Sequence, residues 1–193
     1  FFRKKLSTCY KELWSTDPVF LALKDTIEVY GIQRAYFDDL ISGMEDDLYT
    51  NRYSNFDDLY LYCYRVASVV GMICIEIYGY DNPKAREYAE SWGIFMQLTN
   101  VLRDIGEDIE RDRVYLPGDE LEAMGVKIQM LNGEVRRHQD WEGYVLEYAK
   151  RARNYLKNAK LLLPLLPKRT RYSPAAMMAF YEAILKEIVR RQG

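Results

Sequence analysis

The feature that most constrains the fold is a helical spacing of apolar residues that continues along almost the whole chain. The clearest case is the segment from Pro83 to about Arg111, which contains no helix breaker apart from Gly93 and Gly106. At 1.5 Å per residue, a single helix of this length would be roughly 43 Å long. The segment is therefore predicted to form one long helix that crosses a whole domain.

The rest of the chain also carries helix signals. Asp17-Pro18, Asn82-Pro83 and Ser173-Pro174 each place a capping side chain before a proline, as at the first turn of a helix. No stretch shows the sustained alternation that is typical of a half-buried strand. We therefore predict that residues 1–193 form a single all-α domain. The helices are expected at about 18–30, 34–48, 56–78, 83–111, 119–124, 141–162 and 174–190.

The charge and the chemistry of the side chains exclude several functions. The net charge is −2, whereas a nucleic-acid-binding protein would be expected to be more basic, so we exclude nucleic acid as a partner. The 3 cysteines include no CxxC pair, and the only histidine, His138, lies in a polar stretch. A disulfide framework, a zinc site and a histidine-based triad are therefore not expected. Catalysis, if present, must rely on carboxylates, a bound metal or tyrosine.

The termini and the apolar runs bear on localisation. No signal peptide is visible after Phe1, and the longest apolar stretch, Val66 to Ile75, is about half of the ~20 residues that a membrane span needs. We expect a cytoplasmic protein with reduced thiols. The chain begins without Met, and its first residues start in the middle of a sequence pattern. We therefore expect its natural N-terminus to lie elsewhere.

A row of polar side chains lies in the long predicted helix. Gln97, Asn100, Asp104, Asp108 and Arg111 follow one another at spacings of 3, 4, 4 and 3, which places them on one face. Two carboxylates four residues apart repel each other unless a cation lies between them, and oxygen ligands suit Mg²⁺. A solvated acidic face is the alternative, and the spacing alone slightly favours it, because such faces are common on surface helices.

Three segments resemble signatures of the squalene/phytoene synthase family. Residues 97–108, followed by 113–117, resemble its second aspartate-rich motif, and residues 60–71 resemble its YCYxVAxxVG helix. Residues 41–48 resemble the segment that precedes that helix. The order and the separation of the three match, and the resemblance covers nearly the whole chain. It favours the Mg²⁺ site over the solvated face.

The resemblance implies the isoprenoid synthase fold, a helical bundle around a central substrate cavity. It also implies Mg²⁺-dependent head-to-head condensation of two prenyl diphosphates, through a cyclopropylcarbinyl diphosphate, to phytoene or squalene-type products. Residues 51–60 look closest to phytoene synthases and to bacterial dehydrosqualene or presqualene diphosphate synthases, so NADPH is not expected. The choice between C15 and C20 substrates and the oligomeric state stay open. A hydrocarbon product is compatible with peripheral membrane association.

The family also implies roles for individual residues. The metal ligands would be Asn100, Asp104 and Asp108, with Mn²⁺ as an alternative ion, and Gln97, Arg103 and Arg113 would bind or neutralise phosphate oxygens. The wall of the prenyl tunnel would include Tyr62, Val66, Val70, Gly71 and Leu98, and Tyr181 would lie near the diphosphate.

One family motif is missing from the sequence. The first aspartate-rich motif, of DxxxD type, has no convincing copy; we interpret Asp38-Asp39 and Glu45-Asp46-Asp47 as acids on a helix surface or at a cap. The chain thus resembles the C-terminal two-thirds of a family member, incomplete at its N-terminus and also near its C-terminus, and we expect it to be poorly active alone. The competing hypothesis is a non-catalytic, family-like assembly factor or helical interaction protein. A terpene cyclase that uses one substrate is disfavoured by the YCYxVAxxVG helix.

Overall fold

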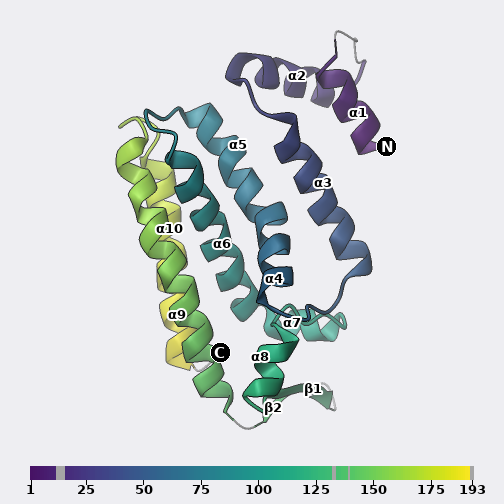
Figure 1. Cartoon of the computed structure of the whole chain (residues 1–193), viewed down its shortest axis with the longest axis vertical. Coiled ribbons are helices and arrows are strands. Elements are labelled where there is room, and N and C mark those ends of the chain that lie inside the picture. Colours follow the sequence, from purple (N-terminus) through teal and green to yellow (C-terminus); the bar gives the residue numbers. More distant parts are fainter. Residues whose placement is uncertain (12–15, 132–133, 139, 192–193) are drawn as a thin grey trace.

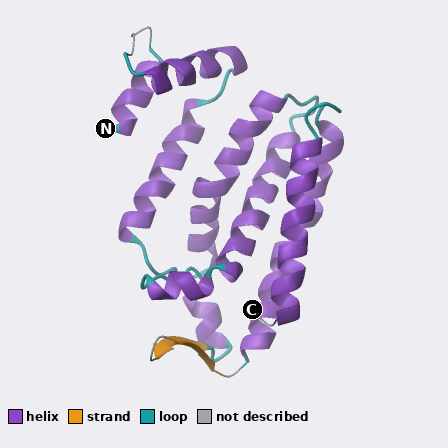
Figure 2. Ribbon diagram, turned by 180° about the vertical axis from the view of Figure 1, so that it is seen from behind, coloured by secondary structure: helices purple, strands orange, loops and turns teal. Residues whose placement is uncertain are grey.

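The computed structural model describes residues 1–11, 16–131, 134–138 and 140–191, and for 129–131 and 134–138 it describes the backbone alone. Within these ranges the chain is a bundle of helices with one short hairpin at its lower end (Figures 1 and 2). The α-helices are α1 (Phe2–Cys9), α2 (Pro18–Tyr30), α3 (Arg34–Tyr49), α4 (Phe56–Cys63), α5 (Val69–Tyr78), α6 (Ala85–Arg103), α7 (Ile105–Glu110), α8 (Gly118–Ala123), α9 (Trp141–Ala159) and α10 (Tyr172–Arg191). A π-helical turn, η1 (Tyr64–Ser68), joins α4 to α5, and a 3₁₀ segment, η2 (Lys160–Leu165), follows α9. The all-α prediction is confirmed.

Helix α6 forms the centre of the bundle. It packs against α9, α5, α10 and η1 (Figure 1). Ala89, Phe95 and Leu98 on this helix are completely buried, so α6 contributes to the core along much of its length. A smaller apolar cluster, including Cys9, Phe20, Ile27, Tyr36 and Met72, joins α1, α2 and α3 to α5.

Two of the three predicted capping side chains, Asp17 and Asn82, make capping hydrogen bonds, whereas Ser173 lies inside α10 (Tyr172–Arg191) and does not precede it. The Asp17 side chain accepts a hydrogen bond from the Val19 amide at 3.1 Å, and Gly31 ends α2 with φ of 63°. Gly31 adopts the left-handed conformation, which glycine reaches without the penalty that a Cβ imposes. Asn82 accepts a hydrogen bond from the Lys84 amide at 2.9 Å, just before α6 begins.

The long helix predicted for residues 83–111 is interrupted once. Asp104, with φ of −96° and ψ of 6°, separates α6 from α7. The guanidinium of Arg103 binds both carboxylate oxygens of Asp104, each at 2.7 Å. Consecutive side chains do not face each other on a regular helix, so the bond between Arg103 and Asp104 is consistent with a local distortion of the helix at Asp104. The backbone bonds from Asp104 N to Asn100 O (2.8 Å) and from Asp108 N to Asp104 O (2.9 Å) persist, so the three residues stay on one side.

The helix predicted for residues 56–78 contains the π-turn η1, and glycines allow its neighbours to approach it closely. A Cβ on Gly93 of α6 would lie 2.4 Å from Ser68 Cα and 2.7 Å from Ala67 C. On the other side, a Cβ on Gly43 of α3 would lie 2.8 Å from Val66 Cγ1. The contact between α6 and η1 therefore leaves no room for any side chain larger than that of glycine at position 93.

The sequence prediction of no strands is wrong in one place. Strands β1 (Lys127–Leu131) and β2 (Glu134–His138) form an antiparallel hairpin, with Lys127 opposite His138. The intervening Asn132-Gly133 is the dipeptide most typical of a two-residue hairpin, and its own conformation lies outside the described residues. The hairpin is a small addition that leaves the all-α class unchanged.

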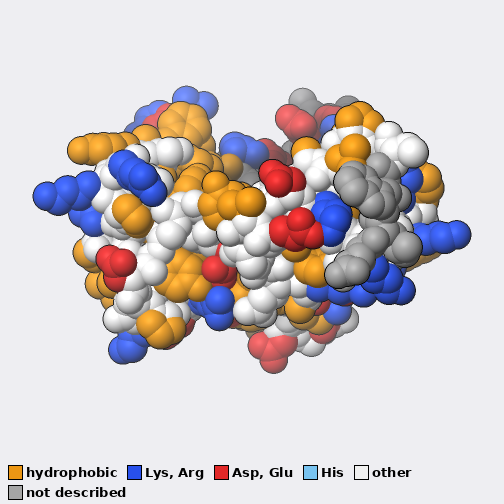
Figure 3. Space-filling view, turned by 90° about the horizontal axis from the view of Figure 1, so that it is seen from above, with side chains coloured by type: hydrophobic (Ala, Val, Ile, Leu, Met, Phe, Trp, Pro, Cys, Tyr) orange, Lys and Arg blue, Asp and Glu red, His pale blue; other side chains and the backbone are white. Residues whose placement is uncertain are grey.

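Two surface properties bear on the environment of the protein. By length and composition alone, one helical run among the described residues, Phe56–Tyr78, is apolar enough to cross a membrane, and 33% of its most apolar window is buried inside the bundle. Core helices pass the same test. From the end that carries α2, the surface is hollowed, and hydrophobic side chains lie beside the hollow (Figure 3).

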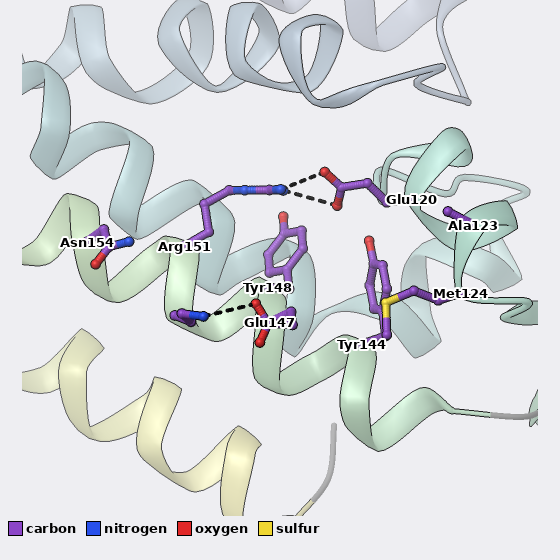
Figure 4. A pocket seen from close by; sticks show the side chains of 9 residues that line it. Glu120, Ala123, Met124, Tyr144, Glu147, Tyr148, Arg151 and Asn154 are labelled. Carbon is purple, nitrogen blue, oxygen red and sulfur yellow. Dashed lines mark hydrogen bonds and ion pairs between the residues drawn. The ribbon is translucent and has the colours of Figure 1, made fainter.

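A cavity of about 410 Å³ lies between α8 and α9 (Figure 4). Arg151 of α9 binds both carboxylate oxygens of Glu120 of α8, at 2.6 and 3.1 Å, and lies 4.0 Å from the centre of the Phe56 ring. The hydroxyls of Tyr144 and Tyr148 point toward this ion pair, and neither has a hydrogen-bond partner among the described residues. Burial raises the pKa of both hydroxyls, so they stay neutral.

We expect Tyr148→Phe to leave the free energy of unfolding unchanged or to raise it by up to about 1 kcal/mol. The substitution removes a buried hydroxyl that has no partner, and such a group is unfavourable in the folded state. The control is Tyr60→Phe, which removes a hydroxyl that donates to the Glu90 carboxylate and should lower stability by about 1–2 kcal/mol. Urea unfolding of the two variants checks the difference, and a clear loss in Tyr148→Phe would contradict this account.

Candidate active site

A polar cavity of about 120 Å³ lies where α4, the end of α6, α7 and the loop after α7 meet. Its lining residues are Tyr62, Gln97, Asn100, Val101, Asp104, Asp108 and Tyr115. The structure thus brings together the row of polar side chains predicted on the long helix, apart from Arg111, which lies outside the cavity wall.

The two aspartates of the cavity differ in their surroundings. The Arg103 guanidinium forms a bidentate bond with Asp104. Burial, and then the charge of Asp104, raises the pKa of the Asp108 carboxyl above its ordinary value. Arg103 also interacts with the Tyr181 hydroxyl of α10, so the predicted Tyr181 lies beside Arg103 and outside the cavity lining. The cavity therefore gathers negative charge that a cation would stabilise.

Asn100 contributes an oxygen that the protein leaves unused. Its Nδ2 donates to Gln97 Oε1 at 3.2 Å, and its Oδ1 is buried with no hydrogen-bond partner among the described residues. A buried oxygen that lacks a hydrogen-bond partner destabilises the folded protein unless a bound ligand interacts with it. Within the described residues, no three His, Cys, Asp or Glu side chains cluster as a complete metal site. Two carboxylates and one amide oxygen fit Mg²⁺, which commonly keeps waters and substrate phosphates among its ligands.

Sequence reasoning missed a tyrosine cluster on the opposite wall. Tyr62 and Tyr115 have ring centres 5.2 Å apart, and Tyr53 packs on both rings. Both cavity hydroxyls donate to Oδ1 of Asp47, at 2.9 Å from Tyr62 and 3.2 Å from Tyr115. Arg113 donates to the Asp47 main-chain oxygen at 2.8 Å. Asp47 was interpreted as a helix-surface or cap acid; only the packing of α3 against its neighbours reveals this contact.

An apolar groove of about 260 Å³ lies between α6 and the segment formed by η1 and α5, and α10 also contributes to its wall. Its lining residues are Val66, Ala67, Val70, Gly71, Cys74, Tyr78, Trp92, Gly93, Met96, Gln97, Asn100 and Met177. Gln97 and Asn100 also line the polar cavity, so the two spaces share a wall. The site therefore has a polar end and an apolar end.

The structure places the predicted tunnel residues in three different positions. Val66, Val70 and Gly71 line the apolar groove. Tyr62 lines the polar cavity instead. Leu98 is 0% exposed and lies in the core, outside both sets of lining residues, because it is on the opposite side of α6 from the groove. Leu98 therefore lies outside the groove wall, although the family resemblance had placed it there.

Comparison with known proteins identifies relatives for the whole chain. The squalene/phytoene synthase family matches residues 1–193. Phytoene synthase 1, chloroplastic, from Arabidopsis thaliana is 41% identical over 180 residues, which are 89% of this chain and 42% of that protein. Phytoene synthase 2, chloroplastic, from Solanum lycopersicum is 38% identical over 180 residues, 89% of this chain and 57% of that protein. The chain spans about half the length of these relatives.

Solved structures support the same assignment. Squalene synthase HpnC from Alicyclobacillus acidocaldarius superposes with a TM-score of 0.87 at 23% identity, over 99% of this chain and 72% of that one, and shows the fold. A dehydrosqualene synthase in complex with a ligand gives a TM-score of 0.83 at 28% identity, over 98% of this chain and 66% of that one. The predicted isoprenoid synthase fold is thus confirmed, and the chain belongs to the squalene/phytoene synthase family.

Proposed function

We propose that the natural protein containing these residues is a prenyltransferase that condenses two prenyl diphosphates head to head to a phytoene- or squalene-type product, releasing diphosphate. The observation that carries the proposal is the shared wall of Gln97 and Asn100 between the polar cavity and the apolar groove. A prenyl diphosphate has the same two parts, a charged head and a hydrocarbon tail. The site would bind the head at Asp104 and Asp108 and the tail along α5.

The side chains of the polar end have distinct tasks in this proposal. Asn100, Asp104 and Asp108 would hold Mg²⁺, which when bound supplies positive charge that helps diphosphate to leave. Arg103, now paired with Asp104, would neutralise a phosphate oxygen, and Arg113 would add positive charge near Tyr115. The apolar groove excludes water from a carbocation, and Tyr181 would contribute its aromatic face.

The competing hypothesis of a non-catalytic, family-like protein makes a different prediction for the same residues. A protein that kept only the fold has no need of two half-buried carboxylates around one cavity, beside a buried amide oxygen without a partner. Here Asp104, Asp108 and Asn100 line one cavity, and Asn100 Oδ1 is unused. This arrangement favours the enzyme over the assembly factor.

Mass spectrometry of the products tests the proposal directly. The natural protein is incubated with farnesyl or geranylgeranyl diphosphate and with Mg²⁺, Mn²⁺ or EDTA, each with and without NADPH. We expect a C40 hydrocarbon from geranylgeranyl diphosphate, with either metal and without NADPH, and no product in EDTA. We choose the C20 substrate because the curated relatives at 37–41% identity are named phytoene synthases. Absence of any condensation product in all samples would contradict the proposal.

We expect Cys74→Trp to reduce the use of the C20 substrate by about 10-fold relative to the C15 substrate. Cys74 lies one turn beyond Val70 along α5 and lines the groove, as do Tyr78 and Trp92, so a larger side chain there should shorten the groove. Competition between farnesyl and geranylgeranyl diphosphate measures the ratio. Cys74→Ser, which preserves the volume, is the matched control. Equal loss with both substrates would contradict this role.

A further inference from the structure

Asp47 is the point where three parts of the fold meet beside the polar cavity. It lies on α3, and its Oδ1 accepts hydrogen bonds from Tyr62 of α4 at 2.9 Å and from Tyr115, in the loop after α7, at 3.2 Å. Its main-chain oxygen accepts from Arg113 at 2.8 Å. Asp47 itself is outside the cavity lining, so its effect on the cavity must pass through the two tyrosines.

These bonds determine where the hydroxyl protons lie. A tyrosine hydroxyl has one proton to donate and two lone pairs that accept. Burial raises the pKa of Tyr62 and of Tyr115, so both hydroxyls keep their protons. Each has the Asp47 carboxylate as an acceptor, and an interaction between the two hydroxyls would also keep the protons within the cluster. Neither proton is then available to a ligand in the cavity.

The consequence is a cavity wall that accepts hydrogen bonds and does not donate them. Tyr62 and Tyr115 line the same space as Asn100, Asp104 and Asp108. Arg113 donates to the Tyr115 hydroxyl at 3.3 Å, so one lone pair of Tyr115 and those of Tyr62 are left to accept from a ligand in the cavity. Phosphate oxygens need donors, which Arg103 and Arg113 supply from the edge of the site. Water bound to a cation needs acceptors, because both of its protons point away from the metal. The tyrosine wall therefore suits the waters of a hydrated cation rather than the phosphate.

We propose that Asp47 is a positioning residue that fixes the hydroxyls of Tyr62 and Tyr115 as acceptors for the waters of the Mg²⁺ held by Asn100, Asp104 and Asp108. This inference rests on the metal site of the proposed function. Mg²⁺ gives up its waters reluctantly, so several are expected to stay in place when it binds. Partners just outside the metal ligands commonly change metal affinity by about 10- to 100-fold.

Isothermal titration calorimetry with Mn²⁺, in the presence of inorganic diphosphate, tests the proposal without measuring turnover. We expect Asp47→Ala to weaken Mn²⁺ binding by about 10- to 100-fold. Asp47→Asn should bind nearly as well as wild type, because an amide oxygen still accepts both hydroxyl protons. Asp39→Ala is the matched control, since Asp39 lies on the same helix and does not line the cavity. Tyr115→Phe keeps the ring but lacks the hydroxyl oxygen, and should reproduce the loss if Asp47→Ala does not fold.

The outcomes separate this inference from the proposed function. Wild-type affinity in both Asp47→Ala and Tyr115→Phe would overturn the role of Asp47 and leave the metal site intact. An equal loss in Asp47→Asn and Asp47→Ala would show that the charge of Asp47 matters rather than its hydrogen bonding, and would also overturn the proposal. A wild-type protein that binds no Mn²⁺ would contradict the metal site itself, and the inference would fall with it.

Discussion

Replacing Asp104 with asparagine is expected to lower kcat/KM by on the order of 100- to 1,000-fold, the range found when one preorganised electrostatic group is removed. The substitution keeps the shape of the side chain and removes its charge. It weakens the cation site proposed for Asp104, Asp108 and Asn100, which line one cavity, and it takes away the bidentate partner of Arg103. Asp108→Asn should have a similar effect. Steady-state kinetics of product formation, on the natural protein with saturating Mg²⁺, provide the measurement.

Glu107 provides the matched control for this prediction. It is an acid on the same short helix, its side chain is 74% exposed, and it is outside the cavity lining. Glu107→Gln changes the net charge by the same amount and should retain nearly full activity. Raising the concentration of Mg²⁺ should partly restore Asp104→Asn if the lost interaction is with the metal. Equal activity of Asp104→Asn and Glu107→Gln would refute a catalytic function for this cavity.

Gly93→Ala is expected to destabilise the fold by about 3 kcal/mol, at the upper end of what one added methyl group does in a packed interior. The new Cβ would lie 2.4 Å from Ser68 Cα and 2.5 Å from Ser68 N. These are backbone atoms, which cannot rotate away as a side chain can. Either α6 must move away from η1, or the π-turn must deform. Urea unfolding followed by circular dichroism measures the loss.

The same substitution at Gly106 should have the opposite sign. An added Cβ there meets no atom within 4 Å, and Gly106 is within helix α7. Alanine is favoured over glycine in a helix by about 0.5–1 kcal/mol, so Gly106→Ala should be slightly more stable than wild type. If the two variants were equally stable, the close approach of α6 to η1 would not be the reason for glycine at position 93.

The sequence predicted the helices and the shared face of the polar row because both depend on local rules. Caps such as Asp17 act within one turn, and the spacing of Asn100, Asp104 and Asp108 follows from helical periodicity. The bend at Asp104 was not predicted, because it accompanies a bond between neighbours that a regular helix would keep apart. It leaves the three residues on one side, so the candidate site survives this error.

Long-range contacts explain what the sequence could not predict. Asp47 and Tyr115 are 68 residues apart, and no periodicity relates them. The family resemblance placed Leu98 in the tunnel wall, but burial of α6 on its other face places it in the core. The hairpin has a local signal in Asn132-Gly133, but the sequence analysis used only the absence of sustained alternation and so predicted no strand.

The π-turn between α4 and α5 determines the direction in which half of the site points. Each residue of an α-helix rotates the chain by about 100° around the helix axis. A π-turn holds one extra residue within a single turn, so the helix lengthens by less than the usual rise per residue. Residues before it, such as Tyr62, line the polar cavity, and residues after it, such as Val70 and Cys74, line the apolar groove. An extra residue in a regular helix would rotate α5 by about 100° relative to α4, more than a quarter of a turn, and the π-turn at Tyr64–Ser68 absorbs that rotation. In this part of the molecule, the number of residues is as much a determinant of substrate fit as their identity.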